Sequence, residues 1–504
     1  MPFDPQFDDY LAADSARAYF DEAGKKEDPG FYLLWGDGVK LLGSSVSGSR
    51  SRIRARGKTG WIDKTALGGQ SLLEFYFIDV GQGDGVLIKT ADFRHILLDA
   101  GYPRAAQPTG KSGADFVDWK FAKDYGTTTI RLDAMISSHI DWDHHGGLND
   151  ILDVSQTAEL DCQAITVEAF YHSGLSHWKA FDGVPEGLGP FTPKTPPSAK
   201  KWFTRLLGDR VSCEAALNEQ GPQVRGTWGK LIKNVVGAKR ADGTPTAIAR
   251  VSHLSQWLPG FSSADPLRIK VLGPVEETVA GAPALRRLGS EQGQNTNGTS
   301  VLLRFDYGKS RTLLTGDLNK RAHQMLLTHY EGAESEFACD VAKSCHHGSD
   351  DVSYAFMNYV KAACTVISSG DAEGHDHPRP KIVAASGLSG YATFKNDELV
   401  TPLVYSTELA RSIMVGKTTF LDATANGGAR TDGPDLAKIE IGYEFTVPGG
   451  LAASKGSKTL NKARVMHKLI YGLVNIRTDG TRILAATMNE GDGSFSVKSF
   501  NSRF

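Results

Sequence analysis

The stretch that decides the fold reads Ser138-His139-Ile140-Asp141-Trp142-Asp143-His144-His145-Gly146-Gly147, and it follows the apolar run Ala134-Met135-Ile136. Two imidazoles and two carboxylates fall within residues 139–144. The pattern predicts a strand, a tight loop and then a helix. Histidine and aspartate supply the nitrogen and oxygen ligands that suit Zn²⁺ or Mn²⁺. Because ionisable groups this dense are rarely stable unless exposed, paired or coordinated, the loop favours a metal site over ordinary core histidines.

The spacing His-x-Asp-x-Asp-His-x-Gly-Gly resembles the second motif of the metallo-β-lactamase-fold hydrolases, whose usual form is His-x-His-x-Asp-His. Asp141 stands where most of that superfamily has its second histidine. With the motifs below, this variant resembles the soluble metallo-hydrolase domain of ComEC-type DNA-uptake proteins, over roughly residues 72–385. The resemblance implies an α/β fold, an αββα sandwich, and two divalent metal ions (Zn²⁺ or Mn²⁺).

Two motifs lie before the metal loop. Phe77 to Ile88 reads as a hairpin whose turn contains Gly81, Gly83 and Asp84, and the glycines allow close backbone approach. Asp84 could then face the metal site as a catalytic candidate, or it could simply bond nearby turn amides. Ile96 to Gly101 resembles the superfamily's first motif, which implies that Asp99 supports the metal loop from behind rather than binding metal.

Three motifs follow the metal loop. An apolar strand ends in Gly316-Asp317, and the resemblance implies that Asp317 bridges the two metals. In Cys345-His346-His347-Gly348, one histidine should close the second metal site; we favour His346 and keep His347 as a catalytic candidate. His377 aligns with a His-Pro-x-Pro motif of the relatives, while His375 is extra. It could orient a phosphate or protonate a leaving group, or it could be a loop histidine without chemistry.

One departure concerns the first metal site. Many superfamily members have a histidine before the strand that precedes Gly-Asp, whereas residues 295–300 contain none. Asn297 could serve there as a weak oxygen ligand or as a hydrogen-bond donor to substrate. The first site would then be loose, or would prefer a harder metal such as Mn²⁺. The implied ligands are His139, Asp141 and Asp317 for one metal, and Asp143, His144, His346 and again Asp317 for the other.

The implied function is metal-dependent hydrolysis by a hydroxide that bridges two metals, with Asp143 in the catalytic set. The resemblance favours a phosphodiesterase or nuclease acting on DNA, RNA or nucleotides. Alternatives are a hydrolase of a non-phosphate ester, thioester or lactone, a cyclic-nucleotide phosphodiesterase, and a non-enzymatic signalling protein with a structural metal.

Length and composition indicate the class of protein in which these motifs occur. The chain has 504 residues, 40% hydrophobic and 23% charged, which predicts a soluble globular protein of two or three domains. It shows no apolar run of bilayer-spanning length and no secretion signal at its start. Five scattered cysteines argue against a disulfide framework and favour the reducing bacterial cytoplasm.

Three regions are expected along the chain. Residues 1–70 should hold a helix over 8–26 and a small SH3-like β module, and residues 71–390 the catalytic domain. Residues 150–295 read as an insertion that covers the active site, with a helix at about 198–208, or as a merely stabilising subdomain. Residues 391–504 form an α/β extension, with a hairpin around Thr478 to Thr481.

Four arginines alternate at 50, 52, 54 and 56. In a strand, alternate residues share one face, so Arg50, Arg52, Arg54 and Arg56 would form a basic stripe able to bind nucleic-acid phosphates. A solvated strand face is the alternative. The net charge of −2 argues against a protein that coats nucleic acid, but it does not exclude a local patch.

Overall fold

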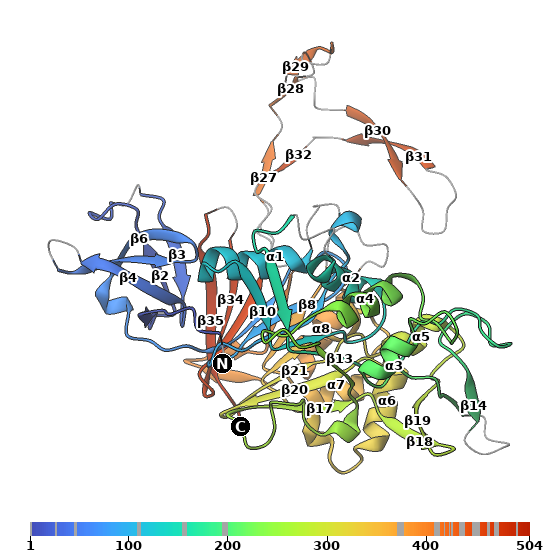
Figure 1. The fold of residues 1–504 in the computed structure, drawn as a ribbon. Helices are drawn as coiled ribbons and strands as arrows, with labels where there is room; N and C mark the ends of the chain where they lie inside the picture. The colour runs from blue at the N-terminus through green and yellow to red at the C-terminus, as the bar shows by residue number, and fades with distance from the viewer. Residues whose placement is uncertain are drawn as a thin grey trace.

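A nine-stranded mixed sheet forms one layer of the protein (Figure 1). The computed structural model describes the chain except for residues 1–2, 26–27, 45–47, 108–111, 154–158, 194–199, 370–376, 408–413, 418, 423, 425–426, 433–438, 446–453, 461–463, 468–472 and 490–491. In spatial order the strands are β16 (Ala247–Arg250), β13 (Ala169–His172), β11 (Ala134–Ile136), β9 (His95–Ala100), β8 (Gly85–Lys89), β7 (Leu73–Phe77), β33 (Val474–Thr478), β34 (Arg482–Met488) and β35 (Phe495–Asn501).

A six-stranded sheet packs face to face against the first. Its strands, in order, are β17 (Leu267–Gly273), β20 (Leu302–Tyr307), β21 (Ser310–Leu314), β22 (Val341–Lys343), β23 (Cys364–Ile367) and β26 (Leu403–Ser406). Buried apolar side chains from both sheets form the core between them. Phe75 of β7 meets Phe305 of β20 edge to face, with ring centroids 5.3 Å apart. Each sheet therefore buries one face against the other. Because helices cover the outer faces as well, the strands have nearly continuous apolar runs.

Helices cover the two outer faces (Figure 1). On the nine-stranded sheet, Val117, Leu148 and Leu231 come from α1 (Gly113–Trp119), α2 (Trp142–Leu152) and α4 (Gly226–Gly237) and join one core. On the six-stranded sheet, Leu326 and Phe356 come from α6 (Lys320–His329) and α7 (Tyr354–Val360) and join another. The order helix, sheet, sheet, helix is the αββα sandwich that the metallo-β-lactamase resemblance predicts, and the predicted fold class is confirmed.

Several other elements lie outside the two main sheets. They are β10 (Thr129–Leu132), β12 (Ala164–Val167), α3 (Arg210–Ala215), α5 (Gln292–Gly298), α8 (Pro380–Ser389), β24 (Thr393–Lys395), β25 (Glu398–Thr401), β27 (Met414–Lys417), β28 (Phe420–Asp422), β29 (Arg430–Asp432), β30 (Ile439–Phe445), β31 (Ser454–Leu460) and β32 (Arg464–His467). The strands β27 to β32 lie away from the sandwich in Figure 1. Within the described part of the chain, no helix is long and apolar enough to cross a bilayer.

The N-terminal residues form a small β module. Its sheet runs β1 (Asp9–Tyr10), β4 (Gly38–Ser44), β5 (Arg50–Ala55) and β6 (Lys58–Asp63), and β2 (Ser15–Ala18) pairs with β3 (Phe31–Leu34). The helix predicted over residues 8–26 is wrong, because β1 and β2 are strands that pair with β4 and β3. Leu11 and Ala18 therefore face a β core instead of one side of a helix. The likeness to SH3 barrels stays a prediction.

Residues 150–295 are not wholly an insertion. Their strands β13, β16 and β17 belong to the two main sheets, while β14 (Phe191–Pro193), β15 (Lys201–Phe203), β19 (Ala282–Arg286) and β18 (Glu276–Val279) form a separate sheet. The helix predicted at about 198–208 is wrong, because β15 pairs with both β14 and β19.

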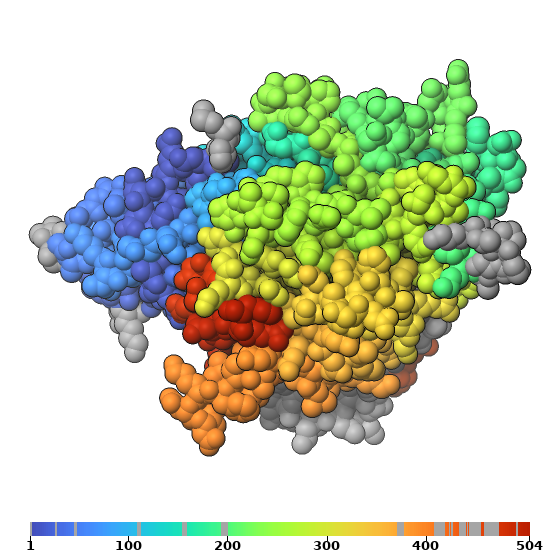
Figure 2. Space-filling model, turned by 90° about the horizontal axis from the view of Figure 1, so that it is seen from below, coloured from blue at the N-terminus to red at the C-terminus, as the bar shows by residue number. Residues whose placement is uncertain are grey.

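The C-terminal hairpin is present as β33 and β34, and its first strand pairs antiparallel with β7. The predicted boundary at residue 390 therefore does not separate two sheets, because the last three strands complete the nine-stranded one. Figure 2 shows these last strands, in red, beside the blue N-terminal module.

Candidate metal centre

The metal loop joins β11 to α2, as the sequence predicts. Asp141 is the N-cap residue of α2, and Asp143 lies in the first turn. A carboxylate in that turn is stabilised by the partial positive charge at the helix N-terminus. His139 and His144 are both buried. The short loop thus directs its imidazoles and carboxylates to one end of the sandwich.

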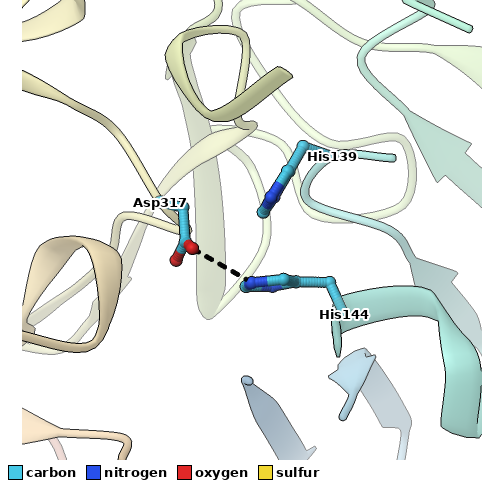
Figure 3. A group of neighbouring side chains, drawn as sticks. All are labelled: His139, His144 and Asp317. Carbon is cyan, nitrogen blue, oxygen red and sulfur yellow. Dashed lines mark ion pairs between the residues drawn. The ribbon is translucent and has the colours of Figure 1, made fainter. Parts of the chain in front are cut away.

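Asp317 is the side chain on which the histidines converge. His139, His144 and Asp317 point toward one another in Figure 3, and their ligand atoms all lie within 4.8 Å of one another. Asp317 Oδ2 is 3.2 Å from His144 Nε2, and the Asp317 backbone amide donates a hydrogen bond to Ser300 Oγ. The residue before it, Gly316, has φ +51° and a Cβ there would lie only 2.9 Å from Ser300 Cβ, so glycine is required.

The structure places His347, not the predicted His346, among the candidate ligands. His347 Nε2 lies 2.9 Å from Asp317 Oδ2 and 3.8 Å from Asp143 Oδ2. Both histidines have left-handed backbone angles, with φ of 48° and 52°, and their rings diverge to an interplanar angle of 74°. His346 belongs to none of the ligand groups found among the described residues. The geometry therefore favours His347 over His346 as a ligand, and the choice between them stays a prediction.

His346 faces Asn297 and His377 instead. When the Asn297 amide is turned with its nitrogen toward Asp141, it donates to Asp141 Oδ2 at 2.8 Å and accepts from His346 Nε2 at 3.2 Å. The rings of His346 and His377 have centroids 5.7 Å apart. His375 lies outside the described residues. These side chains form a polar wall beside the ligand group, and their roles in binding or proton transfer stay predictions.

Asp141 lies at the edge of the cluster. Its Oδ2 is 3.5 Å from His139 Nε2 and accepts a hydrogen bond from Thr296 Oγ1 at 3.0 Å. The structure thus places Asp141 next to His139, where the usual superfamily motif has a histidine.

Two further aspartates stand behind the histidines. Asp99 Oδ2 lies 3.0 Å from His144 Nδ1, and its Oδ1 accepts a hydrogen bond from the Ser138 amide at 2.8 Å. Asp84 Oδ1 lies 3.3 Å from His347 Nδ1. A carboxylate on Nδ1 fixes the orientation of the ring and leaves Nε2 facing the cluster.

Gly83 brings the Asp84 turn against the metal loop. A Cβ at Gly83 would lie 1.8 Å from the backbone oxygen of Asp143, and the residue has φ +109°. Only glycine permits this contact. Gln82 Nε2 then lies 3.3 Å from Asp143 Oδ2 as a hydrogen-bond donor.

Lys343 is the site residue that the sequence analysis missed. Its Nζ contacts Asp84 Oδ2, lies 3.4 Å from Asp317 Oδ1, and donates to the Gly316 carbonyl, although the side chain is only 2% exposed. A lysine at the end of the buried strand β22, two residues before the Cys-His-His turn, is the signal that could have identified it. It supplies a fixed positive charge to a cluster of carboxylates.

The electrostatics of the cluster fit a bound cation. Burial alone would lower the pKa of His347, but Asp317 and Asp84 raise it to about 10, and Asp317, Asp143 and Asp99 likewise raise the pKa of His144 well above its usual value. His347, His144 and Lys343 hold the pKa of Asp317 well below its ordinary range despite its burial. His139 Nε2 is buried with no hydrogen-bond partner among the described residues. The cluster therefore attracts positive charge and has an imidazole nitrogen available as a ligand.

The comparisons with known proteins give little beyond the fold. No protein-family model and no curated protein matches the chain. The chain is similar to a solved structure described as a new diphosphatase from the PhnP family (12% identity, 64% of this chain and 81% of that chain covered, TM-score 0.26). It is also similar to Tm1679, described as a metal-dependent hydrolase of the β-lactamase superfamily (11% identity, 66% and 95% covered, TM-score 0.30). At these scores the fold rests on the sheets and helices described above, and the ComEC resemblance stays a prediction.

The arginine stripe is engaged within the molecule. Arg50, Arg52 and Arg54 do alternate with buried residues on one face of β5. However, Arg50 pairs with Asp63 at 3.0 Å, and Arg54 donates to the Lys123 carbonyl at 2.8 Å. Arg56 pairs with Asp37 at 2.7 Å. Three of the four guanidinium groups thus make contacts inside the protein and Arg52 is exposed, and nucleic-acid binding by this stripe stays a prediction.

Proposed function

We propose that the protein is a metal-dependent hydrolase of phosphodiesters, acting on DNA, RNA or nucleotides. The observation that carries the proposal is the convergence of three buried histidines on one carboxylate. His139 and His144 come from the β11–α2 segment, His347 comes from the Cys-His-His turn, and the three meet at Asp317. Such a group has no structural use in a sandwich core, where ionisable side chains are costly to bury.

Two divalent ions, Zn²⁺ or Mn²⁺, fit the donor set. One would be held by His139, Asp141 and Asp317, and the other by Asp143, His144, His347 and Asp317. Bound there, the ions would lower the pKa of water and neutralise charge on a phosphodiester.

The protein's own residues would do the rest. Asp99 holds the His144 ring through Nδ1, and the Ser368 carbonyl holds the His347 ring through Nδ1 at 3.1 Å, with the Asp84 carboxylate 3.3 Å from the same nitrogen. Asn297 and His346 would orient the phosphate from the polar wall beside the cluster, and His377 would supply the proton to the leaving oxygen.

The test compares ligand variants with a matched surface variant. Purified protein loaded with Mn²⁺ or Zn²⁺ is incubated with single- and double-stranded DNA, bis-p-nitrophenyl phosphate and a lactone panel. Asp143→Ala and Asp317→Ala should each reduce phosphodiester cleavage more than about a hundredfold, since even residues behind metal ligands often cost that much. The exposed Asp242→Ala should cleave like the parent.

Other outcomes would replace the proposal. Turnover of lactones or thioesters without any phosphodiester cleavage would assign the site to acyl hydrolysis. Full metal occupancy without turnover of any substrate would leave a structural or signalling metal site.

A further inference from the structure

A cavity separate from the metal centre lies where the N-terminal module, α1 and the last strands meet. It has a volume of about 350 Å³, and none of the candidate metal ligands lines it. Half-buried aromatic side chains make up much of its wall, among them Tyr32, Phe116, Trp119 and Phe495. A cavity of this size at a junction of chain segments is typical of small-molecule sites.

The floor of the cavity rests on a buried charge cluster. Lys120 lines the floor at 5% exposure, and its Nζ lies 2.7 Å from Asp124 Oδ2 and donates to Tyr76 Oη at 2.9 Å. Arg56 also lines the cavity, with its guanidinium 4.8 Å from the ring centroid of Phe495. Cations and aromatic rings thus line the same cavity.

This charge cluster carries a surplus of positive charge. Its four cations outnumber its three carboxylates by one. Although burial opposes it, Arg477 and its neighbouring cations hold the pKa values of Asp37 and Glu74 below their ordinary range, so both carboxylates are ionised. The exposed Lys58 adds another positive charge on the cavity lining, opposed there by Asp492. The cations are Arg56, Lys89, Lys120 and Arg477, and the carboxylates are Asp37, Glu74 and Asp124.

We propose that this cavity binds a planar aromatic anion of nucleoside-monophosphate size. The base would stack between Trp119 and Phe495, and the phosphate would lie toward Arg56 and Lys58. A neutral aromatic ligand would gain no electrostatic attraction from the surplus positive charge. An inorganic anion would make no stacking contact with the aromatic side chains. The site is independent of the metal centre and of its proposed function.

The test measures binding with the metal centre disabled. Isothermal titration calorimetry with AMP is carried out on metal-stripped full-length protein carrying Asp317→Ala, where one site per chain is expected. Adding Phe495→Ala should weaken AMP binding at least about tenfold, as expected for the loss of a stacked base. Lys58→Glu, at an exposed position that folding tolerates, should also weaken it.

Matched variants and probes distinguish binding in this cavity from adsorption elsewhere on the protein surface. Phe394→Ala (71% exposed) and Lys498→Glu should bind AMP like the parent. Adenosine and inorganic phosphate alone should each bind more weakly than AMP. If a 5′-phosphorylated tetranucleotide binds as tightly as AMP, the ligand of the cavity is the 5′ end of a nucleic-acid chain. If the tetranucleotide does not bind, the ligand is the free nucleotide. The proposal is overturned if AMP does not bind, or if it binds equally to the Phe495→Ala and Lys58→Glu proteins.

Discussion

The two carboxylate oxygens of Asp317 have different neighbours. Oδ1 lies 3.4 Å from Lys343 Nζ, whereas Oδ2 lies 2.9 Å from His347 Nε2 and 3.2 Å from His144 Nε2. Lys343 also contacts Asp84, the carboxylate behind His347. The lysine therefore holds both a candidate bridging ligand and the support of another ligand.

Lys343→Met should empty the metal site and destabilise the protein. The substitution keeps the length of the side chain but leaves Asp84 and Asp317 without their cation. Breaking a buried ion pair in this way costs about 3–5 kcal/mol. We expect a lower free energy of unfolding in urea, and less metal per chain by mass spectrometry of the dialysed protein. The exposed Lys309→Met is the control, and full metal content in Lys343→Met would contradict the positioning role.

At the residue scale, the sequence predicted most of the cluster but not its details. The family resemblance implied that His139, Asp143, His144 and Asp317 belong to one ligand set. In the structure they lie close together after β11 and β21, which belong to different sheets. The resemblance could not distinguish His346 from His347, since that choice depends on two left-handed residues in succession. The role of Lys343 was missed because its partners, Asp84 and Asp317, are distant in sequence.

The helix that carries the metal ligands is supported by the helix α4. His145 Nε2 of α2 lies 3.1 Å from Thr227 Oγ1, and Asn149 Oδ1 accepts a hydrogen bond from Asn234 at 3.0 Å. Trp228 of α4 is 1% exposed, and its ring meets that of His145 edge to face at 5.5 Å. Residues 150–295 thus help to hold the metal loop.

Trp228→Ala should loosen α2 and lower metal affinity. Removing a buried tryptophan leaves a cavity and costs about 3–5 kcal/mol of stability. Because the cavity opens against α2, we expect weaker Zn²⁺ binding by competition with a chelating dye, as well as a lower thermal midpoint. Leu388→Ala, at a side chain 88% exposed, should change neither. Unchanged metal affinity in a destabilised Trp228→Ala protein would show that α4 only stabilises the fold.

At the element scale, strands with continuous apolar runs were predicted well and short elements poorly. The β33–β34 hairpin and the β11–α2 junction follow from local patterns. The strands β2 and β15 were read as helix because pairing with other strands, β3 and β19, determines their conformation. The boundary predicted at residue 390 does not separate two sheets, since β33 pairs with β7 about 400 residues away.

One guanidinium joins three distant parts of the chain in the whole molecule. Arg477 of β33 is fully buried, and its Nη2 lies 2.8 Å from Asp37 of the N-terminal module and 3.3 Å from Glu74 of β7. Arg477→Met should cost about 3–5 kcal/mol, because both carboxylates stay buried without their partner. We expect earlier proteolysis near residue 37 and a lower urea midpoint. The control is Arg430→Met, which removes an exposed ion pair worth under about 1 kcal/mol. Equal urea midpoints and equal proteolysis of the two variants would show that Arg477 does not hold these parts of the chain together.

The stability of the whole molecule should fall steeply in acid. Burial lowers the pKa values of four histidines to about 3. These are His95, His145, His172 and His323. Between about pH 6.5 and 3 the unfolded chain binds protons at these positions and the folded chain does not, so stability falls as the pH is lowered through this window. Within this window, each such histidine lowers the free energy of unfolding by about 1.4 kcal/mol for each unit by which the pH falls.

Metal-free protein should lose stability on the alkaline side as well. The pKa of His347, raised to about 10, gives stability that is fully present below about pH 6.5 and is lost as the pH rises through 10. The urea midpoint of metal-free protein should therefore peak near neutral pH. His323→Gln should reduce the fall of stability in acid by about one histidine's share, because its ring is buried against Phe356, with ring centroids 4.3 Å apart. A flat midpoint between pH 4 and 7 would show that these four rings take up protons without cost, and would contradict their burial as neutral imidazoles.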